Sequence, residues 1–254
     1  MELQIENINK TFMNDGKPLS VLEQISFNAE KGKFISLLGP SGCGKTTLLT
    51  IIAGFQKADS GSIKVKGKEV RKAGPDRGFI FQNYALFPWM TVKDNITFPM
   101  KQVKMKKEDI KERSDHLLRL AHLDGKENLY PHQISGGMKQ RTALIRGLAT
   151  APDLLLMDEP LGALDYQMRQ KLQSELEEIW LEDRTTVVMV THDVDEAVYL
   201  SDRVIIMSNE RGKIIKDLNI DLSRPRNRQS DDYKEYTEQL TQTLNNIDLG
   251  KQKS

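Results

Sequence analysis

The residues best suited to chemistry form one glycine-rich segment with the spacing G-x-x-x-x-G-K-T, a pattern typical of phosphate-binding loops. It consists of Gly39, Pro40, Ser41, Gly42, Cys43, Gly44, Lys45 and Thr46, followed by Thr47. Glycines let the backbone wind around an anion and point its N–H groups inward. Lys45 adds a mobile positive charge for the outer phosphates, and the Thr46 hydroxyl can hold Mg²⁺. We therefore expect these residues to contact a nucleotide.

The sequence around this loop supports the prediction. A strand-like run, FISLL, precedes the loop, and a helical stretch, TTLLTIIAGF, follows it, so a helix N-terminus adds favourable partial charge. A glycine-rich turn that binds nothing is the alternative, but it would need neither flanking element. The loop alone does not separate a transport ATPase from a kinase or a GTPase. We assign Cys43 no redox role and interpret it as a small filler of the loop.

Continuous apolar runs at residues 34–38, 154–157 and 187–190 predict strands buried on both faces, as in a parallel sheet covered by helices. A fourth run, at residues 204–207, is a candidate for the same sheet. The first three each end in reactive side chains, and open α/β sheets bind ligands beyond the carboxyl ends of their strands. The sequence thus predicts which edge of the sheet carries the chemistry.

Two of these strand ends carry candidate catalytic groups, Asp158-Glu159 and His192. Adjacent carboxylates after an apolar run are costly unless a cation uses them, so Asp158 is expected to position Mg²⁺ and Glu159 to act as general base. The alternative is a pair of helix-capping acids, with Pro160 favouring a turn. His192 is either an ordinary core histidine or, from its place at a strand end, a contact of the γ-phosphate and the attacking water.

Composition sets limits on the partners. The 254 residues include 37 Lys+Arg and 36 Asp+Glu, a net charge of +1, so no bulk attraction to nucleic acid is expected. A single cysteine excludes an intramolecular disulfide and suits a reducing compartment. No apolar run approaches the roughly 20 residues that cross a bilayer as a helix, and the N-terminus does not resemble a signal peptide. Any membrane step would therefore need another protein.

The predicted fold class is α/β. We expect a P-loop NTPase core with a parallel central sheet, an antiparallel β subdomain at the N-terminal side, built from short alternating strands, and an inserted α-helical subdomain. The insertion spans about residues 88–150, within an ATPase domain at residues 1–222, and residues 223–254 form a short, partly helical tail. Arg224, Arg226 and Arg228 at the start of this tail are interpreted as a solvated linker.

Residues 134–140, ISGGMKQ, resemble the signature motif of ABC ATPases, from which Ile134 and Met138 depart because Leu and Gln are usual there. The order of elements is also that of the family: the phosphate loop, Gln82, this signature, LLLMDEP, LGALD and then His192. The similarity extends over nearly the whole chain. Independently of the family, Ser135-Gly136-Gly137 precedes a helical stretch and so forms a second anion site at a helix N-terminus.

The resemblance implies a head-to-tail homodimer, or a paired ATPase subunit, in which Ser135, Gly136 and Gly137 of one subunit close on the ATP held by the other. It further implies that Gln82 reaches Mg²⁺ and senses a permease, and that Asp165 lies at the dimer seam. Phe12 stands where the family places an aromatic ring against adenine, the alternative being an edge-strand core residue.

Longer stretches, among them FQNYALFPWMTVKDNI and THDVDEAVYLSDRVIIMS, resemble the branch that serves nitrate, sulfonate and taurine importers, although Leu161 replaces a common Phe. Importers of thiamine-precursor pyrimidines are similar. This resemblance implies an integral membrane permease, an extracytoplasmic solute-binding protein acting indirectly, and a peripheral position on the cytoplasmic face of the cell membrane. Phe87, Pro88 and Trp89 are expected to dock a permease helix, unless Trp89 packs inside the subdomain.

Three other classes remain as alternatives. A non-transport ABC ATPase would usually carry tandem ATPase domains or a long coiled-coil insertion, and the sequence shows neither. A P-loop kinase would not need the signature, and a GTPase would need an Asn-Lys-x-Asp segment, which is not found.

Overall fold

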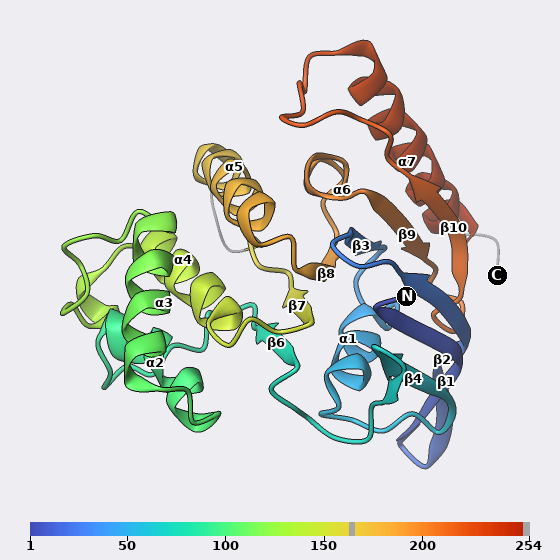
Figure 1. Cartoon of the computed structure of the whole chain (residues 1–254). Coiled ribbons are helices and arrows are strands. Elements are labelled where there is room, and N and C mark those ends of the chain that lie inside the picture. Colours follow the sequence, from blue (N-terminus) through green and yellow to red (C-terminus); the bar gives the residue numbers. More distant parts are fainter. Residues whose placement is uncertain (163–165, 251–254) are drawn as a thin grey trace. The chain divides into compact units, whose positions relative to one another are not determined.

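The computed structural model describes residues 1–162 and 166–250. The chain forms two compact units: unit 1 comprises residues 1–73 and 186–254, and unit 2 comprises residues 74–185. The architecture is α/β in both units (Figure 1). Among the described residues, no helix has the length and apolar character that a membrane span requires.

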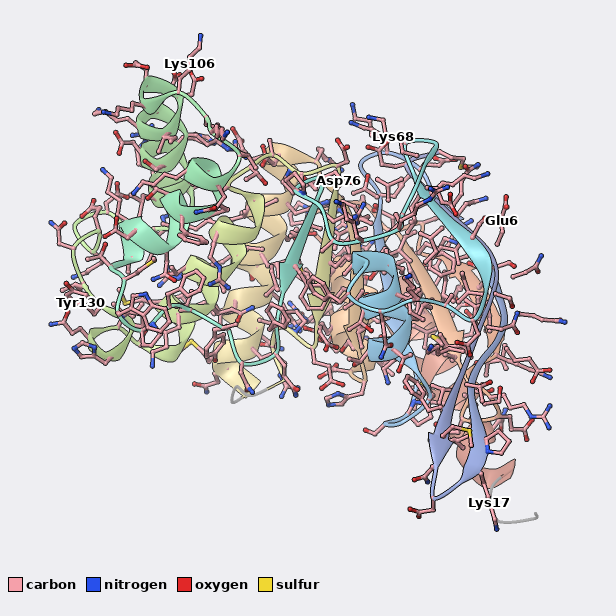
Figure 2. All side chains as sticks on the ribbon, turned by 90° about the horizontal axis from the view of Figure 1, so that it is seen from below. Glu6, Lys17, Lys68, Asp76, Lys106 and Tyr130 are labelled. Atoms are coloured by element: carbon pink, nitrogen blue, oxygen red, sulfur yellow. The ribbon has the colours of Figure 1, made fainter. Side chains whose placement is uncertain are left out.

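The first part of unit 1 is an antiparallel sheet with the strand order β2-β1-β4-β5. Its strands are β1 (Leu3–Asn14), β2 (Lys17–Ala29), β4 (Ser60–Val65) and β5 (Lys68–Glu69). Two of them are longer than the short strands expected, because β1 and β2 continue as a hairpin of 12 and 13 residues. The hairpin turns at Asp15 and Gly16, which both have positive φ, and Figure 2 shows Lys17 at its tip.

The second sheet of unit 1 has the strand order β10-β9-β3-β8. Its strands are β3 (Phe34–Leu38), β8 (Thr186–Thr191), β9 (Arg203–Met207) and β10 (Ile214–Asn219). β3 pairs in parallel with both β8 and β9, and its residues are all buried, as are those of β8. The apolar runs therefore form buried parallel strands as predicted. The antiparallel strand β10 was not predicted, because its half-buried alternation is a weak signal.

Three helices accompany these strands: α1 (Lys45–Ala53), α6 (Val194–Leu200) and α7 (Asp231–Gly250). α1 leaves the end of β3, α6 leaves the end of β8, and α7 ends the described chain. α7 packs against α6, and Figure 1 shows the two helices side by side.

Unit 2 contains the parallel pair β6 (Arg77–Ile80) and β7 (Leu154–Asp158). Its helices are α2 (Val92–Gln102), α3 (Lys107–Leu120), the 3₁₀ turn η1 (Pro131–Gln133), α4 (Gly136–Leu148) and α5 (Tyr166–Asp183). The helices from α2 to α4 occupy the stretch where an inserted helical subdomain is expected, and Lys106 marks the start of α3 (Figure 2). α3 buries an apolar side of the helix, and Leu117 on that side is 0% exposed.

The interpretation of Arg224, Arg226 and Arg228 as a solvated linker is wrong. The Arg226 side chain is buried, with the residue 6% exposed, and it donates hydrogen bonds to backbone carbonyls of α6. Arg224 and Arg228 also contact α6 or its flanking residues. A charge run is solvated only when no nearby backbone or carboxylate group can pair with it, and here the C-terminal end of a short helix provides such groups.

Candidate functional site

The phosphate loop joins β3 to α1, and glycine is required at its ends. Gly44 is the N-cap of α1 with φ 95°. A Cβ atom on Gly44 would lie 2.8 Å from Leu22 Cδ2 and 2.9 Å from the Val21 carbonyl oxygen. A Cβ atom on Gly39 would lie 2.5 Å from the Met207 carbonyl oxygen. Strands β2 and β9 thus enclose the loop so closely that only glycine fits at these two positions.

Lys45 is buried within this loop, with an exposure of 4%. Its Nζ donates hydrogen bonds to the carbonyl oxygens of Gly39, at 2.7 Å, and Pro40, at 2.8 Å. A buried ammonium group needs such partners, and the two carbonyl oxygens keep the Lys45 ammonium group next to the loop. Burial raises the pKa of the neighbouring Cys43 thiol, although Lys45 opposes the shift. Cys43 therefore remains a protonated filler, consistent with a role without redox chemistry.

Phe12 lies on β1 opposite Leu19 of β2. Two residues further along β2, or about 7 Å, Val21 approaches Gly44 of the phosphate loop. Phe12 is half-buried, and the Lys10 ammonium lies 5.3 Å from its ring centroid. The pairing of β1 with β2 therefore places Phe12 on the hairpin that also borders the phosphate loop, and its contact with adenine stays a prediction.

Asp59 anchors this part of β1 and was not found from the sequence. Its carboxylate accepts hydrogen bonds from Lys10 Nζ at 2.8 Å and from the Thr11 backbone N–H at 2.6 Å. The hydrogen bond from Lys10 is the main cause that lowers the pKa of Asp59. Asp59 precedes β4, so only the pairing of β1 with β4 brings it to Lys10.

His192 shares a sheet edge with the phosphate loop. Leu38 of β3 pairs with Thr191 of β8 in parallel register, so Gly39 and His192 leave neighbouring strands at the same edge. His192 is exposed, which excludes the ordinary core histidine. The turn that carries it is fixed on both sides, because Thr191 Oγ1 accepts from the Asp193 N–H at 3.0 Å and also bonds to the Glu196 carboxylate.

Unit 2 has an equivalent strand edge. Ile80 of β6 pairs with Met157 of β7 in parallel register, so Gln82 and Glu159 follow neighbouring strands. The Gln82 Nε2 amide lies 3.4 Å from Glu159 Oε2. Glu159 has φ 44°, a left-handed conformation that costs about 1–3 kcal/mol in a residue other than glycine. Other non-glycine residues of the chain, such as Lys66 and Arg211, also have positive φ, so the catalytic role of Glu159 stays a prediction.

The signature segment forms the N-terminus of α4, also in unit 2. Ser135 is the N-cap, and its Oγ accepts a hydrogen bond from the Met138 N–H at 3.3 Å. Gly136 is exposed. Gly137 is buried, and a Cβ atom on it would lie 3.4 Å from Met168 Sδ. The helix therefore presents a serine hydroxyl and small residues at its positive end. Asp165 lies outside the described residues.

An aromatic group follows Gln82. The Phe87 ring lies 5.7 Å from Trp89 and 5.0 Å from Phe98, centroid to centroid. Trp89 is 70% exposed, so the alternative that it packs inside the subdomain is wrong. Arg146, from α4, places its guanidinium 5.7 Å from the Phe87 ring centroid. An exposed tryptophan beside half-buried aromatic rings is typical of a protein-binding site.

Arg146 also holds the backbone that connects Gln82 to this aromatic group. It donates hydrogen bonds to the carbonyl oxygens of Tyr84, at 2.8 Å, and Ala85, at 2.6 Å. Both residues have positive φ. The sequence gave no signal for this role, because Arg146 lies 61 positions from Ala85.

The expected Mg²⁺ ligands are the Thr46 hydroxyl in unit 1 and the Gln82 amide and Asp158 carboxylate in unit 2. All three are oxygen donors, which suit Mg²⁺, and Mg²⁺ takes few protein ligands when phosphates and water supply the rest. Within residues 1–162 and 166–250, no group of three His, Cys, Asp or Glu side chains could hold a metal ion. The donor chemistry therefore fits Mg²⁺ bound together with a nucleotide.

A phosphate loop between a parallel strand and a helix, with carboxylates at a strand end, defines a P-loop nucleoside triphosphatase. Comparisons with known proteins identify the family within this class. Residues 22–162 match the ABC transporter family. The chain is 43% identical over 242 residues to an aliphatic sulfonates import ATP-binding protein of Bacillus cereus, covering 95% of each chain. It is 47% identical over 231 residues to a bicarbonate transport ATP-binding protein of Synechococcus elongatus, covering 88% of this chain and 34% of that protein.

Solved structures agree with this result. A dimeric bacterial ABC transporter cassette matches with a TM-score of 0.75 at 31% identity, covering 86% of this chain and 98% of that one. A dimeric post-hydrolysis cassette bound to ADP and Pi matches with a TM-score of 0.74 at 30% identity, with the same coverage. The chain belongs to the ABC transporter family and is an ATP-binding ATPase of that family, so the predicted fold class and enzyme class are confirmed.

Proposed function

We propose that this ATPase drives a separate membrane permease of a solute importer, from the cytoplasmic face of the cell membrane. Its similarity to ATP-binding proteins of sulfonate and bicarbonate transport supports the importer class. A small anionic solute of the nitrate, sulfonate or taurine type is our first candidate, and a thiamine-precursor pyrimidine is the alternative. An extracytoplasmic binding protein would supply the solute to the permease.

The observation that carries this proposal is that two helices of one chain begin with small residues, an arrangement suited to binding anions. The phosphate loop stands at the N-terminus of α1 in unit 1, and Ser135 caps the N-terminus of α4 in unit 2. A head-to-tail dimer would give each ATP one site from each subunit, and the similar solved cassettes are dimeric. ATP would then act as the contact that closes the dimer, and hydrolysis would release it.

In this proposal each strand end has its own role in hydrolysis. Lys45 exchanges its bonds to the loop carbonyls for phosphate oxygens, and His192 contacts the γ-phosphate. Glu159 accepts a proton from the attacking water while the Gln82 amide, 3.4 Å away, orients its carboxylate. Thr46, Gln82 and Asp158 would hold Mg²⁺, which would supply positive charge to offset that of the phosphates. Phe12 stacks on adenine, and Asp165 contributes at the dimer seam.

A mixing experiment tests the shared site. Subunits carrying Ser135→Arg lose the signature site, and subunits carrying Lys45→Ala lose the phosphate loop, so each homodimer should be inactive. A mixed dimer has one intact composite site, and we expect the mixture to recover ATP hydrolysis that neither variant shows alone. If Ser135→Arg subunits hydrolyse ATP at the full rate by themselves, the shared site does not exist.

A further inference from the structure

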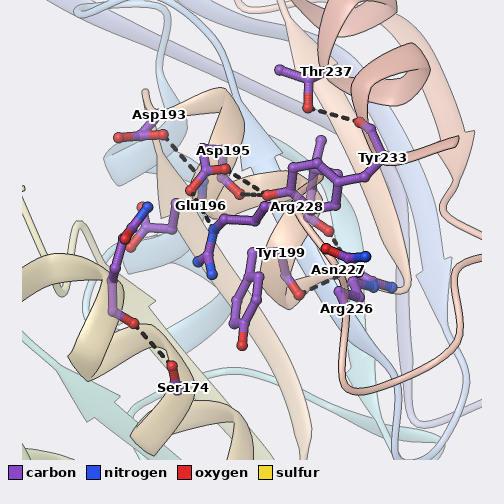
Figure 3. Close-up of polar contacts among 12 residues, drawn as sticks. Ser174, Asp193, Asp195, Glu196, Tyr199, Arg226, Asn227, Arg228, Tyr233 and Thr237 are labelled. Atoms are coloured by element: carbon purple, nitrogen blue, oxygen red, sulfur yellow. Dashed lines mark hydrogen bonds and ion pairs between the residues drawn. The ribbon is translucent and has the colours of Figure 1, made fainter. Parts of the chain in front are cut away.

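The polar tail that follows β10 grips α6, the helix that begins two residues after His192. Four residues make this grip, which we call the α6 clasp: Arg224, Arg226, Arg228 and Tyr233. They contact both ends of the helix, and Figure 3 labels three of them, Arg226, Arg228 and Tyr233. All of these elements belong to unit 1.

Two arginines satisfy the C-terminal end of α6. Arg226 donates to the carbonyl oxygens of Val198 and Tyr199, the latter at 3.1 Å. Arg224 donates to the Leu200 carbonyl at 2.6 Å and to the Asp202 carboxylate at 3.0 Å. The last carbonyls of a helix have no partner within it, and positive charge is stabilising at this end.

The other two residues hold the first turn of α6 through Asp195. Arg228 Nε lies 3.2 Å from Asp195 Oδ2, and its guanidinium lies 3.6 Å from the Tyr199 ring centroid. The Tyr233 hydroxyl donates to Asp195 Oδ1 at 2.6 Å. Burial, followed by the bond to Asp195, raises the pKa of the Tyr233 hydroxyl, which therefore stays protonated as a donor. Figure 3 shows Arg228 and Tyr233 meeting at Asp195.

The first turn of α6 in turn fixes the residues on either side of His192. The Asp193 carboxylate accepts from the Glu196 N–H at 3.1 Å, and the Glu196 carboxylate bonds to the Thr191 hydroxyl. α6 has 7 residues, too few for a helix to be stable without tertiary contacts. Its placement therefore depends on what packs against it, and the clasp supplies hydrogen bonds at both of its ends.

We propose that the clasp residues are positioning residues for ATP hydrolysis, which hold the His192 turn in its working geometry from a segment outside the ATPase motifs. This inference rests on the proposed contact between His192 and the γ-phosphate. The clasp touches neither nucleotide nor Mg²⁺ in this scheme. It sets the placement of the imidazole and leaves the phosphate loop, which binds the nucleotide, unchanged.

The test compares Tyr233→Phe, which removes one hydroxyl and keeps the ring, with Arg228→Ala and Arg228→Lys in the purified full-length chain. Lys234→Ala is the matched control, because Lys234 is the next residue of α7 and its side chain is 58% exposed. We expect Tyr233→Phe and Arg228→Ala to lower kcat by about tenfold, since small misplacements of a catalytic group are costly. The KM for ATP should stay within about twofold of the wild-type value, both in these variants and in the control. Arg228→Lys should recover part of the rate because it keeps the ion pair.

Combining Tyr233→Phe with His192→Ala shows whether the clasp acts by positioning His192 or by stabilising the protein in general. If the clasp acts through His192, Tyr233→Phe should produce no further loss of kcat in the His192→Ala background. An equal loss in both backgrounds, or an unchanged kcat in both clasp variants, overturns the inference while leaving the proposed function intact. A wild-type rate for His192→Ala alone would instead refute the proposed role of His192. Thermal unfolding of each variant shows whether a loss of rate merely reflects unfolding.

Discussion

The two strand edges that carry the candidate site residues are built in different ways. The edge of unit 1 combines a loop whose Gly39 and Gly44 are enclosed by neighbouring strands with a histidine turn held by the Thr191 side chain and, through α6, by the clasp. The edge of unit 2 places Glu159 in a left-handed conformation and continues beyond Gln82 into a segment held by the distant Arg146. The first edge is enclosed by neighbouring strands and by α6, whereas the segment after Gln82 is held by two side chains, Arg146 and Asn95.

This difference suggests that the two edges contribute differently to nucleotide binding and to turnover. A phosphate loop whose backbone is already enclosed can bind a triphosphate with a change in the Lys45 side chain alone, which favours affinity. The segment after Gln82 contains Tyr84 and Ala85 in left-handed conformations, each costing about 1–3 kcal/mol, and it is stabilised by contacts that a partner protein could alter. Burial lowers the pKa of Arg146, the residue that holds it. We therefore expect the phosphate loop of unit 1 to determine nucleotide binding, and turnover to depend on His192 of unit 1 together with Glu159 and its neighbours in unit 2.

The largest expected effect is that of Glu159→Gln. The amide keeps the shape of the side chain but cannot accept the proton of the attacking water, so kcat should fall by about 10²–10⁴-fold. MgATP binding should persist, and the protein should accumulate as a nucleotide-bound dimer in size-exclusion chromatography with ATP. A fully active variant would remove Glu159 as general base and with it the role of this strand edge of unit 2 in turnover.

Lys45→Ala should have the opposite signature, losing binding. The substitution removes charge-assisted bonds to phosphate worth about 1.5–3 kcal/mol each, so ATP affinity measured by calorimetry should fall by about 100-fold. Lys57→Ala, an exposed lysine beyond α1, serves as the control. Unchanged ATP affinity in Lys45→Ala would contradict the phosphate-loop assignment.

Arg146→Ala tests whether the segment after Gln82 depends on one side chain. Hydrogen exchange of the amides in residues 82–89 should accelerate by about tenfold or more, since two charge-assisted hydrogen bonds are lost. Amides of the phosphate loop should exchange at the wild-type rate, and Arg119→Ala, on the exposed side of α3, should change neither. Uniform acceleration across both regions would mean that the two edges do not differ in the way described above.

Trp89→Ala should have the smallest effect on the isolated subunit. Trp89 is 70% exposed, so the free energy of unfolding should change by no more than about 0.5 kcal/mol, and basal ATP hydrolysis should stay constant. Co-purification with the membrane permease should be lost, because exposed aromatic residues often dominate binding. Undiminished co-purification would exclude the aromatic group as the docking surface.

Much of the site could be predicted from the sequence because its chemistry is local. The phosphate loop needs glycines and a lysine at fixed spacing, and the carboxylates and histidine directly follow apolar runs, so strand pairing alone places them at sheet edges. Asp59, Arg146 and the α6 clasp could not be predicted in this way. Each is a polar side chain whose partner is far away in the sequence, and polar residues show no periodicity that would indicate such a partner.

The sequence by itself therefore determined the family, the phosphate loop, the buried parallel strands and the identity of the candidate catalytic residues. Only the tertiary structure decided that the arginines of the tail are packed against α6, that Trp89 is exposed, and that Arg146 holds the segment after Gln82. The physical reason is that motif chemistry is encoded by neighbours along the chain. The burial of a charge depends instead on which distant backbone carbonyls folding brings within hydrogen-bonding distance.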